Sequence, residues 1–135
     1  MTEDDLKKWI KKCEGIQFHP YLDTTGHVTI GWGRDLDNGI SLDEAELMFK
    51  NDYERSVYEL EQYDWYANQP QNVQFALINM NFNLGITKLN EFKGMIRALR
   101  AKNYTAAATH ALNSKWATQV HGRAKDIAAM IMAGK

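Results

Sequence analysis

The beginning of the chain carries the apolar spacing of an amphipathic helix. Apolar side chains recur three and four residues apart, at Leu6, Trp9, Ile10 and Cys13. Thr2, which is followed by acidic residues, is a suitable N-cap, and Gly15 is expected to end the helix. This pattern places Glu14 on the last helical turn.

Residues 16–33 show a different pattern, which predicts a β-hairpin. β-Branched and aromatic residues lie on both sides of the segment Asp23-Thr24-Thr25-Gly26. A glycine-containing turn between two such runs is typical of antiparallel strands. Residues 35–39 are then expected to form a loop that leaves the small sheet.

Helices are predicted for the remainder of the chain. Ser41 and Glu44 form a capping box, because each side chain can bond the backbone N–H of the other residue, and the helix extends to about Glu61. A second helix begins near Pro70 and ends at Gly85. Shorter helices are expected at 91–101, 104–112 and 121–132. One helix, a small antiparallel sheet and then helices alone indicate an α+β fold.

The tryptophans are assigned mainly to the core. Trp9, Trp65 and Trp116 are expected to pack in the core and not to bind sugar, because aromatic side chains at helical spacing usually pack. Cys13 is expected to be a core cysteine because it lies on the apolar face of the first helix. Trp32 lies between two glycines on the second strand, and both burial and partial exposure are consistent with its position.

Composition and charge narrow the class of protein. The 135 residues are 44% hydrophobic and 24% charged, as in soluble globular domains, and no apolar run approaches the ~20 residues of a membrane helix. Sixteen basic and 17 acidic residues give a net charge of −1, so nucleic acid is not an expected partner. The single cysteine allows no internal disulfide, and the acidic start shows no pattern of a secretory signal.

A pair of carboxylates is the remaining candidate for catalysis. The four histidines lack the spacing of metal ligands, so neither a metal nor another cofactor is expected. Glu14 ends a helix, Asp23 begins the hairpin turn, and Thr29 lies on the returning strand. Two acids on different elements can serve glycoside hydrolysis, in which one donates a proton and the other stays ionised. An acid at a helix end and another before a turn are also common structural features, so spacing alone leaves both interpretations open.

The segment from Glu14 to Gly33 resembles the active-site signature of the phage-type lysozymes, glycoside hydrolase family 24. Glu-Gly is followed by Asp23, nine residues after the glutamate, and by Thr-Ile-Gly-Trp-Gly at residues 29–33. The likeness continues downstream in the family's order, at residues 43–46, 76–85 and 114–125. It therefore extends over nearly the whole chain.

The resemblance implies a muramidase that hydrolyses the β-1,4 bond between N-acetylmuramic acid and N-acetylglucosamine in bacterial peptidoglycan, with inversion. It also implies a single two-lobed lysozyme domain over residues 1–135. The parts would be a sheet lobe at about 14–40, a bridging helix at 42–61, and a helical lobe of residues 1–13 and 62–135. The glycan would bind in a cleft between the lobes.

The same resemblance implies roles for individual residues. Glu14 would be the general acid, while Asp23 and Thr29 would hold and activate the attacking water. The expected substrate-binding residues are Gly33, Phe82, Trp32, His110 and Arg123. The position of Phe82 is also consistent with the core, and Arg123 would lie near Glu14 and help to orient it.

Several positions depart from the best-known members of that family. Met95 and His110 stand where those members have small polar residues, so contacts with the sugar there are in doubt. Arg34 stands where they have a histidine, and Asp52 aligns with the acidic partner of that histidine. We therefore predict an ion pair between Arg34 and Asp52.

The resemblance leaves the biological role open. An endolysin would be a monomer that accumulates in the host cytoplasm and depends on a holin-type membrane protein to reach the wall. The alternatives are a virion-associated lysozyme used during entry and a non-catalytic module that binds the cell wall. A binding module does not need Glu14, Asp23 and Thr29 together, so the complete set argues against it.

Overall fold

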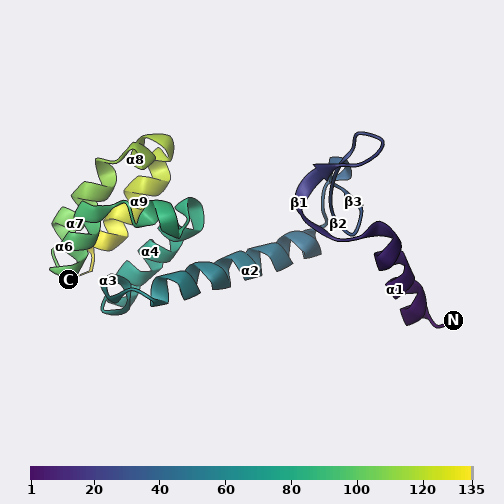
Figure 1. Cartoon of the computed structure of the whole chain (residues 1–135). Coiled ribbons are helices and arrows are strands. Elements are labelled where there is room, and N and C mark those ends of the chain that lie inside the picture. Colours follow the sequence, from purple (N-terminus) through teal and green to yellow (C-terminus); the bar gives the residue numbers. More distant parts are fainter. Residues whose placement is uncertain (135) are drawn as a thin grey trace. The chain divides into compact units, whose positions relative to one another are not determined.

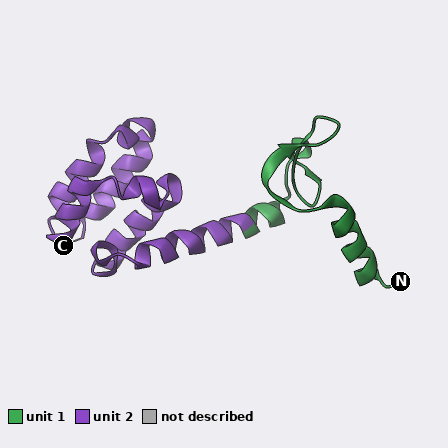
Figure 2. Ribbon diagram, in the orientation of Figure 1, with its two compact units in different colours: residues 1–47 green, residues 48–135 purple. Residues whose placement is uncertain are grey.

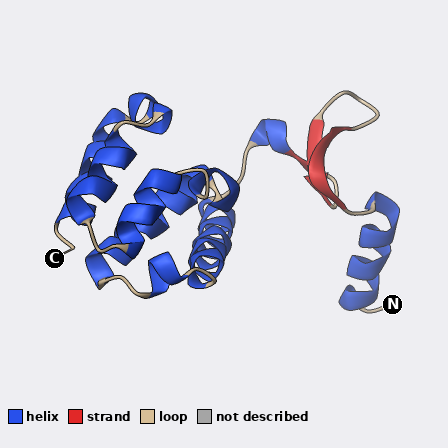
Figure 3. Ribbon diagram, turned by 60° about the vertical axis from the view of Figure 1, so that its left-hand side comes forward, coloured by secondary structure: helices blue, strands red, loops and turns tan. Residues whose placement is uncertain are grey.

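The chain is divided into two compact units. The computed structural model describes residues 1–134, with the elements labelled in Figure 1. Unit 1 comprises Met1–Leu47 and unit 2 comprises Met48–Lys135 (Figure 2). All strands of residues 1–134 belong to unit 1, while the described part of unit 2 consists of helices joined by loops and turns (Figure 3). The predicted α+β class is confirmed, and each unit is described by itself.

The first helix of unit 1 is the one that the sequence predicts. Helix α1 spans Glu3–Glu14. The Asp5 N–H donates to Thr2 Oγ1 at 3.1 Å, and the Thr2 N–H donates to Asp5 Oδ2 at 3.0 Å, so the N-terminus carries a reciprocal capping box. Gly15, at φ 68°, ends the helix in a conformation that glycine adopts readily.

The apolar face of α1 differs from the prediction. None of its twelve residues is buried. Trp9 is 56% exposed and Cys13 is also exposed, so the predicted core around these two side chains is not found within unit 1. The helical period places them on one face, but no element of unit 1 covers that face, and periodicity alone cannot reveal such a cover.

A small antiparallel sheet follows α1. Its strands are β1 (Gln17–Leu22), β2 (Val28–Gly31) and β3 (Arg34–Asp35), in the order β1-β2-β3. Thr29 pairs with Tyr21 on one side and with Asp35 on the other. The hairpin is confirmed, and the expected loop is replaced by β3 and the 3₁₀ helix η1 (Leu36–Asn38).

Helix α2 spans Leu42–Glu61, as the sequence predicts. Its capping box is formed, since the Ser41 N–H donates to Glu44 Oε1 at 2.9 Å and the Glu44 N–H donates to Ser41 Oγ at 3.2 Å. These bonds occupy backbone donors that the first turn of a helix would leave unsatisfied.

Unit 2 contains seven further helices within its described residues. They are α3 (Asp64–Ala67), α4 (Gln71–Leu84), α5 (Ile86–Leu89), α6 (Lys93–Arg100), α7 (Tyr104–Leu112), α8 (Lys115–Gln119) and α9 (His121–Met132). The sequence predicts the four longest of these. The short helices α3, α5 and α8 were not predicted, because one turn of helix is too short to show a period.

The core of unit 2 is formed by buried side chains from several helices, with α4, α6, α7 and α9 among them. Leu77 and Met80 of α4 and Ile131 of α9 are fully buried there. Trp65 and Trp116 are also buried, which confirms their assignment to the core. No helix within residues 1–134 combines the length and the apolar character that crossing a membrane requires.

Candidate active site

The hairpin turn holds the carboxylate of Asp23 with three donors. Asp23 Oδ1 accepts from the backbone N–H of His27, the backbone N–H of Thr25 and the Thr25 hydroxyl, each at 2.9 Å. The His27 N–H is the largest cause of the lowered pKa of Asp23, and both Thr25 donors act in the same direction. Donors of this kind stabilise the charged form, so the carboxylate stays ionised near neutral pH.

Thr29 is fixed by the same turn. Its hydroxyl donates to the backbone oxygen of His27 at 2.9 Å, and its exposed fraction is 3%. It is the only buried residue of unit 1, all of which the structure describes. Because a hydroxyl has one hydrogen and two lone pairs, Thr29 Oγ1 can still accept a hydrogen bond from a water molecule.

Gly33 provides space for the carboxyl group of Glu14. Glu14 is the last residue of α1, and Gly33 has φ 77°. A Cβ atom on Gly33 would lie 2.6 Å from Glu14 Oε2 and 3.0 Å from Glu14 Cδ. The sequence singles out Gly33 only as a position that contacts the saccharide, whereas the structure brings it against the candidate general acid.

Trp32 lies beside α1 and is about half exposed. Its exposed fraction is 48%, and the ammonium group of Lys11 lies 4.2 Å from the centroid of the Trp32 ring. Such cation–π contacts are weakly stabilising at exposed sites. Of the two interpretations that the sequence leaves open for Trp32, the structure supports partial exposure.

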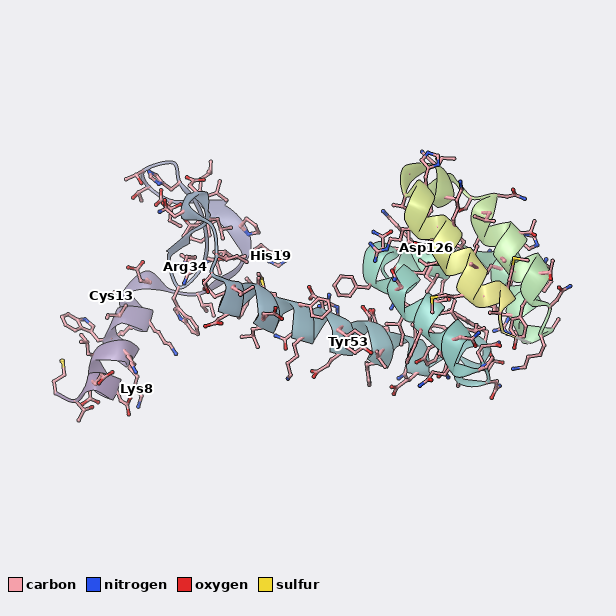
Figure 4. The ribbon with its side chains drawn as sticks, turned by 180° about the vertical axis from the view of Figure 1, so that it is seen from behind. Lys8, Cys13, His19, Arg34, Tyr53 and Asp126 are labelled. Atoms are coloured by element: carbon pink, nitrogen blue, oxygen red, sulfur yellow. The ribbon has the colours of Figure 1, made fainter. Side chains whose placement is uncertain are left out.

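Arg34 pairs with Glu44, not with Asp52. Its Nη1 lies 2.6 Å from Glu44 Oε2 and 2.7 Å from Oε1, whereas Asp52 accepts from Arg55 at 2.9 Å. The predicted Arg34–Asp52 pair is therefore wrong; Figure 4 labels Arg34. The pKa of Glu44 is lowered to about 2. The hydrogen bond from Arg34 is the largest cause, and the hydrogen bond from the Ser41 N–H is the second.

His27 gathers two further carboxylates beside the hairpin. Its Nδ1 lies 3.1 Å from Asp35 Oδ2 and 3.8 Å from Asp37 Oδ2. The Asp35 bond is the largest cause of the raised pKa of His27. These three side chains are the one group within residues 1–134 whose potential ligand atoms lie within 4.8 Å of one another. They are paired among themselves at the surface, and we assign no metal to them.

Two other predicted residues, Phe82 and Arg123, line one pocket of unit 2. The pocket has a volume of about 380 Å³ and is lined by Phe49, Tyr53, Phe75, Ile78, Asn79, Phe82 and Arg123. The rings of Phe49 and Phe82 lie 5.5 Å apart. Arg123 Nε donates to Asn79 Oδ1 at 2.8 Å, and its Nη2 donates to the Asn79 carbonyl oxygen at 3.3 Å. The expected proximity of Arg123 to Glu14 stays a prediction.

His110 lines a second pocket of unit 2. This pocket has a volume of about 570 Å³ and includes Met95, Trp116 and three lysines in its lining. A Cβ atom on Gly94 would lie 2.6 Å from His110 Nδ1, so the imidazole packs closely on that glycine. His110 is exposed, whereas Met95 is fully buried.

Comparison with known proteins identifies the family. The chain matches the Phage lysozyme family over residues 11–130. This range includes Glu14, Asp23 and Thr29. The chain belongs to the phage lysozyme family.

Three curated proteins show more distant similarity. The pre-baseplate central spike protein Gp5 of Enterobacteria phage T4 is 24% identical over 160 aligned positions, which cover 96% of this chain and 28% of that protein. Probable T4-type lysozyme 2 of Dictyostelium discoideum is 28% identical over 113 positions, covering 81% of this chain and 66% of that protein. Probable T4-type lysozyme 1 of the same organism is 26% identical, with coverages of 70% and 58%. The chain thus spans less than two thirds of the length of each relative.

Within this phage lysozyme domain, sequence reasoning missed one residue at the site. His27 bonds both Asp23 and Thr29 through its backbone and Asp35 through its side chain. The signal in the sequence is Asp35, the acidic residue that follows Arg34 and that pairs with Thr29 across the two strands. That signal becomes readable only when the register between β2 and β3 is known.

Proposed function

We propose that this chain is a glycoside hydrolase that cleaves the β-1,4 bond between N-acetylmuramic acid and N-acetylglucosamine in bacterial peptidoglycan. The observation that carries the proposal is the turn around Asp23, whose three donors favour an ionised carboxylate. Membership of the phage lysozyme family supports the same chemistry.

Glu14 and Asp23 take complementary roles in this mechanism. Glu14 donates its proton to the glycosidic oxygen as the bond to the anomeric carbon breaks. Asp23 accepts a proton from a water molecule that attacks that carbon from the opposite face, so the configuration is inverted. Thr29 orients this water through the lone pairs of its hydroxyl, whose hydrogen is already donated to His27.

We assign substrate contacts to residues of each unit, described separately. Trp32 presents a half-exposed ring that can lie against a sugar, and Gly33 leaves room beside the general acid. Phe82, His110 and Arg123 line the two pockets of unit 2 described above. We propose that the glycan contacts these pocket residues. We also propose that the chain is organised as a sheet lobe, a bridging helix and a helical lobe.

Two biological settings fit this activity. The first is a lytic enzyme that acts at the end of infection, which is consistent with membership of the phage lysozyme family. The match of 96% of the chain to part of a phage spike protein supports a second setting, in which the enzyme is carried on the virion and opens the wall during entry.

The activity is tested on outer-membrane-permeabilised Gram-negative cells and on purified peptidoglycan. Loss of turbidity and release of new reducing ends are measured for the wild type, Glu14→Gln and Asp23→Asn. Removing a general acid or base lowers the rate by about 10²–10⁴-fold, so both variants should be nearly inactive.

Glu3→Gln is the matched control, because Glu3 is an exposed residue at the other end of α1. It should keep wild-type activity. Circular dichroism checks that each variant is folded. Wild-type rates in folded Glu14→Gln or Asp23→Asn would refute the assigned roles, and an inactive wild type would refute the proposed function.

A further inference from the structure

The backbone of one hairpin residue, His27, contacts both residues that we assign to the attacking water. The His27 N–H donates to Asp23 Oδ1, the Asp23 N–H donates to the His27 carbonyl oxygen, and the Thr29 hydroxyl donates to that same oxygen. All three distances are 2.9 Å. The orientation of the His27 backbone therefore determines where the Asp23 carboxylate and the Thr29 oxygen lie.

The side chain of His27 attaches this stretch of backbone to the next part of the chain. Its Nδ1 lies 3.1 Å from Asp35 Oδ2. Asp35 is itself held in place, because its Oδ1 accepts from the Asp37 N–H at 2.9 Å and its Oδ2 accepts from Asn38 Nδ2 at 3.4 Å. Asp35 also pairs with Thr29 across β2 and β3. The imidazole thus connects the turn to a carboxylate whose position is set by its own hydrogen bonds.

We infer that His27 is a positioning residue of the proposed hydrolase: its pairing with Asp35 holds the backbone that aligns Asp23 and Thr29 with the attacking water. This inference rests on the proposed function. His27 contacts neither the sugar nor the water in this scheme, and it acts only through the two residues that its backbone orients.

The pairing depends on the protonation of the imidazole. The charged groups that act on it are Asp35 on β3, Asp23 at the turn and Asp37 in η1, and all three are acidic. They raise the pKa of His27, with the Asp35 hydrogen bond as the largest cause. The ion pair therefore forms while Asp35 is ionised and the imidazole is protonated, and it weakens as pH rises through the raised pKa of His27.

Kinetics across pH 5–9 test the inference with three variants. His27→Ala removes the attachment, so kcat should fall about three- to tenfold while KM changes by less than about twofold, as expected when alignment and not binding is lost. His27→Asn should restore most of kcat at neutral pH, because an asparagine Nδ2 can occupy the place of the imidazole Nδ1. His19→Ala, at an exposed histidine of β1, is the control and should match the wild type.

The pH profile separates positioning from a merely structural role. In the wild type, kcat should decline on the alkaline side with an apparent pKa above the ordinary value of His. This step should be missing in both His27 variants, since neither has a group that titrates at this position. Retention of kcat and of the step in His27→Ala would overturn the inference, as would a loss confined to KM.

A measurement without catalysis keeps the inference separate from the proposed function. In NMR spectra of the whole chain, the amide signals of Asp23 and Thr29 should titrate together with the His27 ring, and should not do so in His27→Asn. If the wild type proves inactive on peptidoglycan, the proposed function fails and this titration alone decides whether His27 controls the turn. Amide signals that do not follow the ring would overturn the inference.

Discussion

Unit 1 holds the candidate catalytic residues by hydrogen bonds, with only Thr29 buried among them, whereas unit 2 is stabilised by a continuous apolar core. In residues 1–47, Thr29 is the only buried residue, and the positions of Asp23, His27 and Asp35 are set by polar contacts. In the described part of unit 2, fully buried side chains such as Leu77 and Ile131 come from different helices.

This difference predicts where each kind of mutation is felt. Removing apolar volume should destabilise unit 2, because closely packed side chains cannot fill the space that is left. Removing a polar contact from unit 1 should change geometry and activity more than stability, because exposed ion pairs contribute little to the free energy of unfolding.

The largest effect on stability is expected from Leu77→Ala. Leu77 is fully buried in α4, and such a change lowers the free energy of unfolding by about 2–5 kcal/mol. Leu47→Ala is the matched control, since Leu47 lies inside helix α2 and is 59% exposed; it should change stability by about 0.5 kcal/mol or less. Urea denaturation followed by circular dichroism measures both, and equal midpoints would contradict the contrast between the units.

A smaller effect, on activity, is expected from Gly33→Ala. The new Cβ would lie 2.6 Å from Glu14 Oε2, and the end of this flexible side chain can move away. Displacing the acid should lower kcat by about 10- to 100-fold, since errors of about 1 Å at a reacting group have effects of this size.

Gly39→Ala controls for backbone strain. Gly39 has φ 76°, close to that of Gly33, but a Cβ there would meet no atom within 4 Å. The Gly39→Ala variant should be somewhat less stable than the wild type and should keep the wild-type kcat. A similar loss of kcat in both variants would show that strain, and not contact with Glu14, explains the result.

The smallest effect is expected at the Arg34–Glu44 pair. The pKa of Glu44 is lowered to about 2 in the folded chain, so the stability that it contributes is present above its ordinary pKa and is lost as pH falls through the range from about 4.5 to about 2. The urea midpoint of the wild type should decrease over that range more steeply than that of Glu44→Gln. Glu46→Gln, at another exposed glutamate of α2, should follow the wild type.

The local elements of this chain could be predicted from its sequence. The bounds of α1 and α2 follow from caps at Thr2 and Ser41, and the hairpin follows from the glycine-containing turn after Asp23. The motif with Glu14, Asp23 and Thr29 also located the candidate site. These signals arise from contacts between residues a few positions apart, which a linear pattern retains.

By itself the sequence determined the family signature, the α+β class, and the order and approximate bounds of the longer elements. Only the tertiary structure decided that Arg34 pairs with Glu44, that Gly33 borders the Glu14 carboxyl, and that Asp35 holds His27. The physical reason is that caps and periods depend on backbone geometry within one or two turns. The other contacts depend on strand register and on which of several acids a turn brings within hydrogen-bond distance.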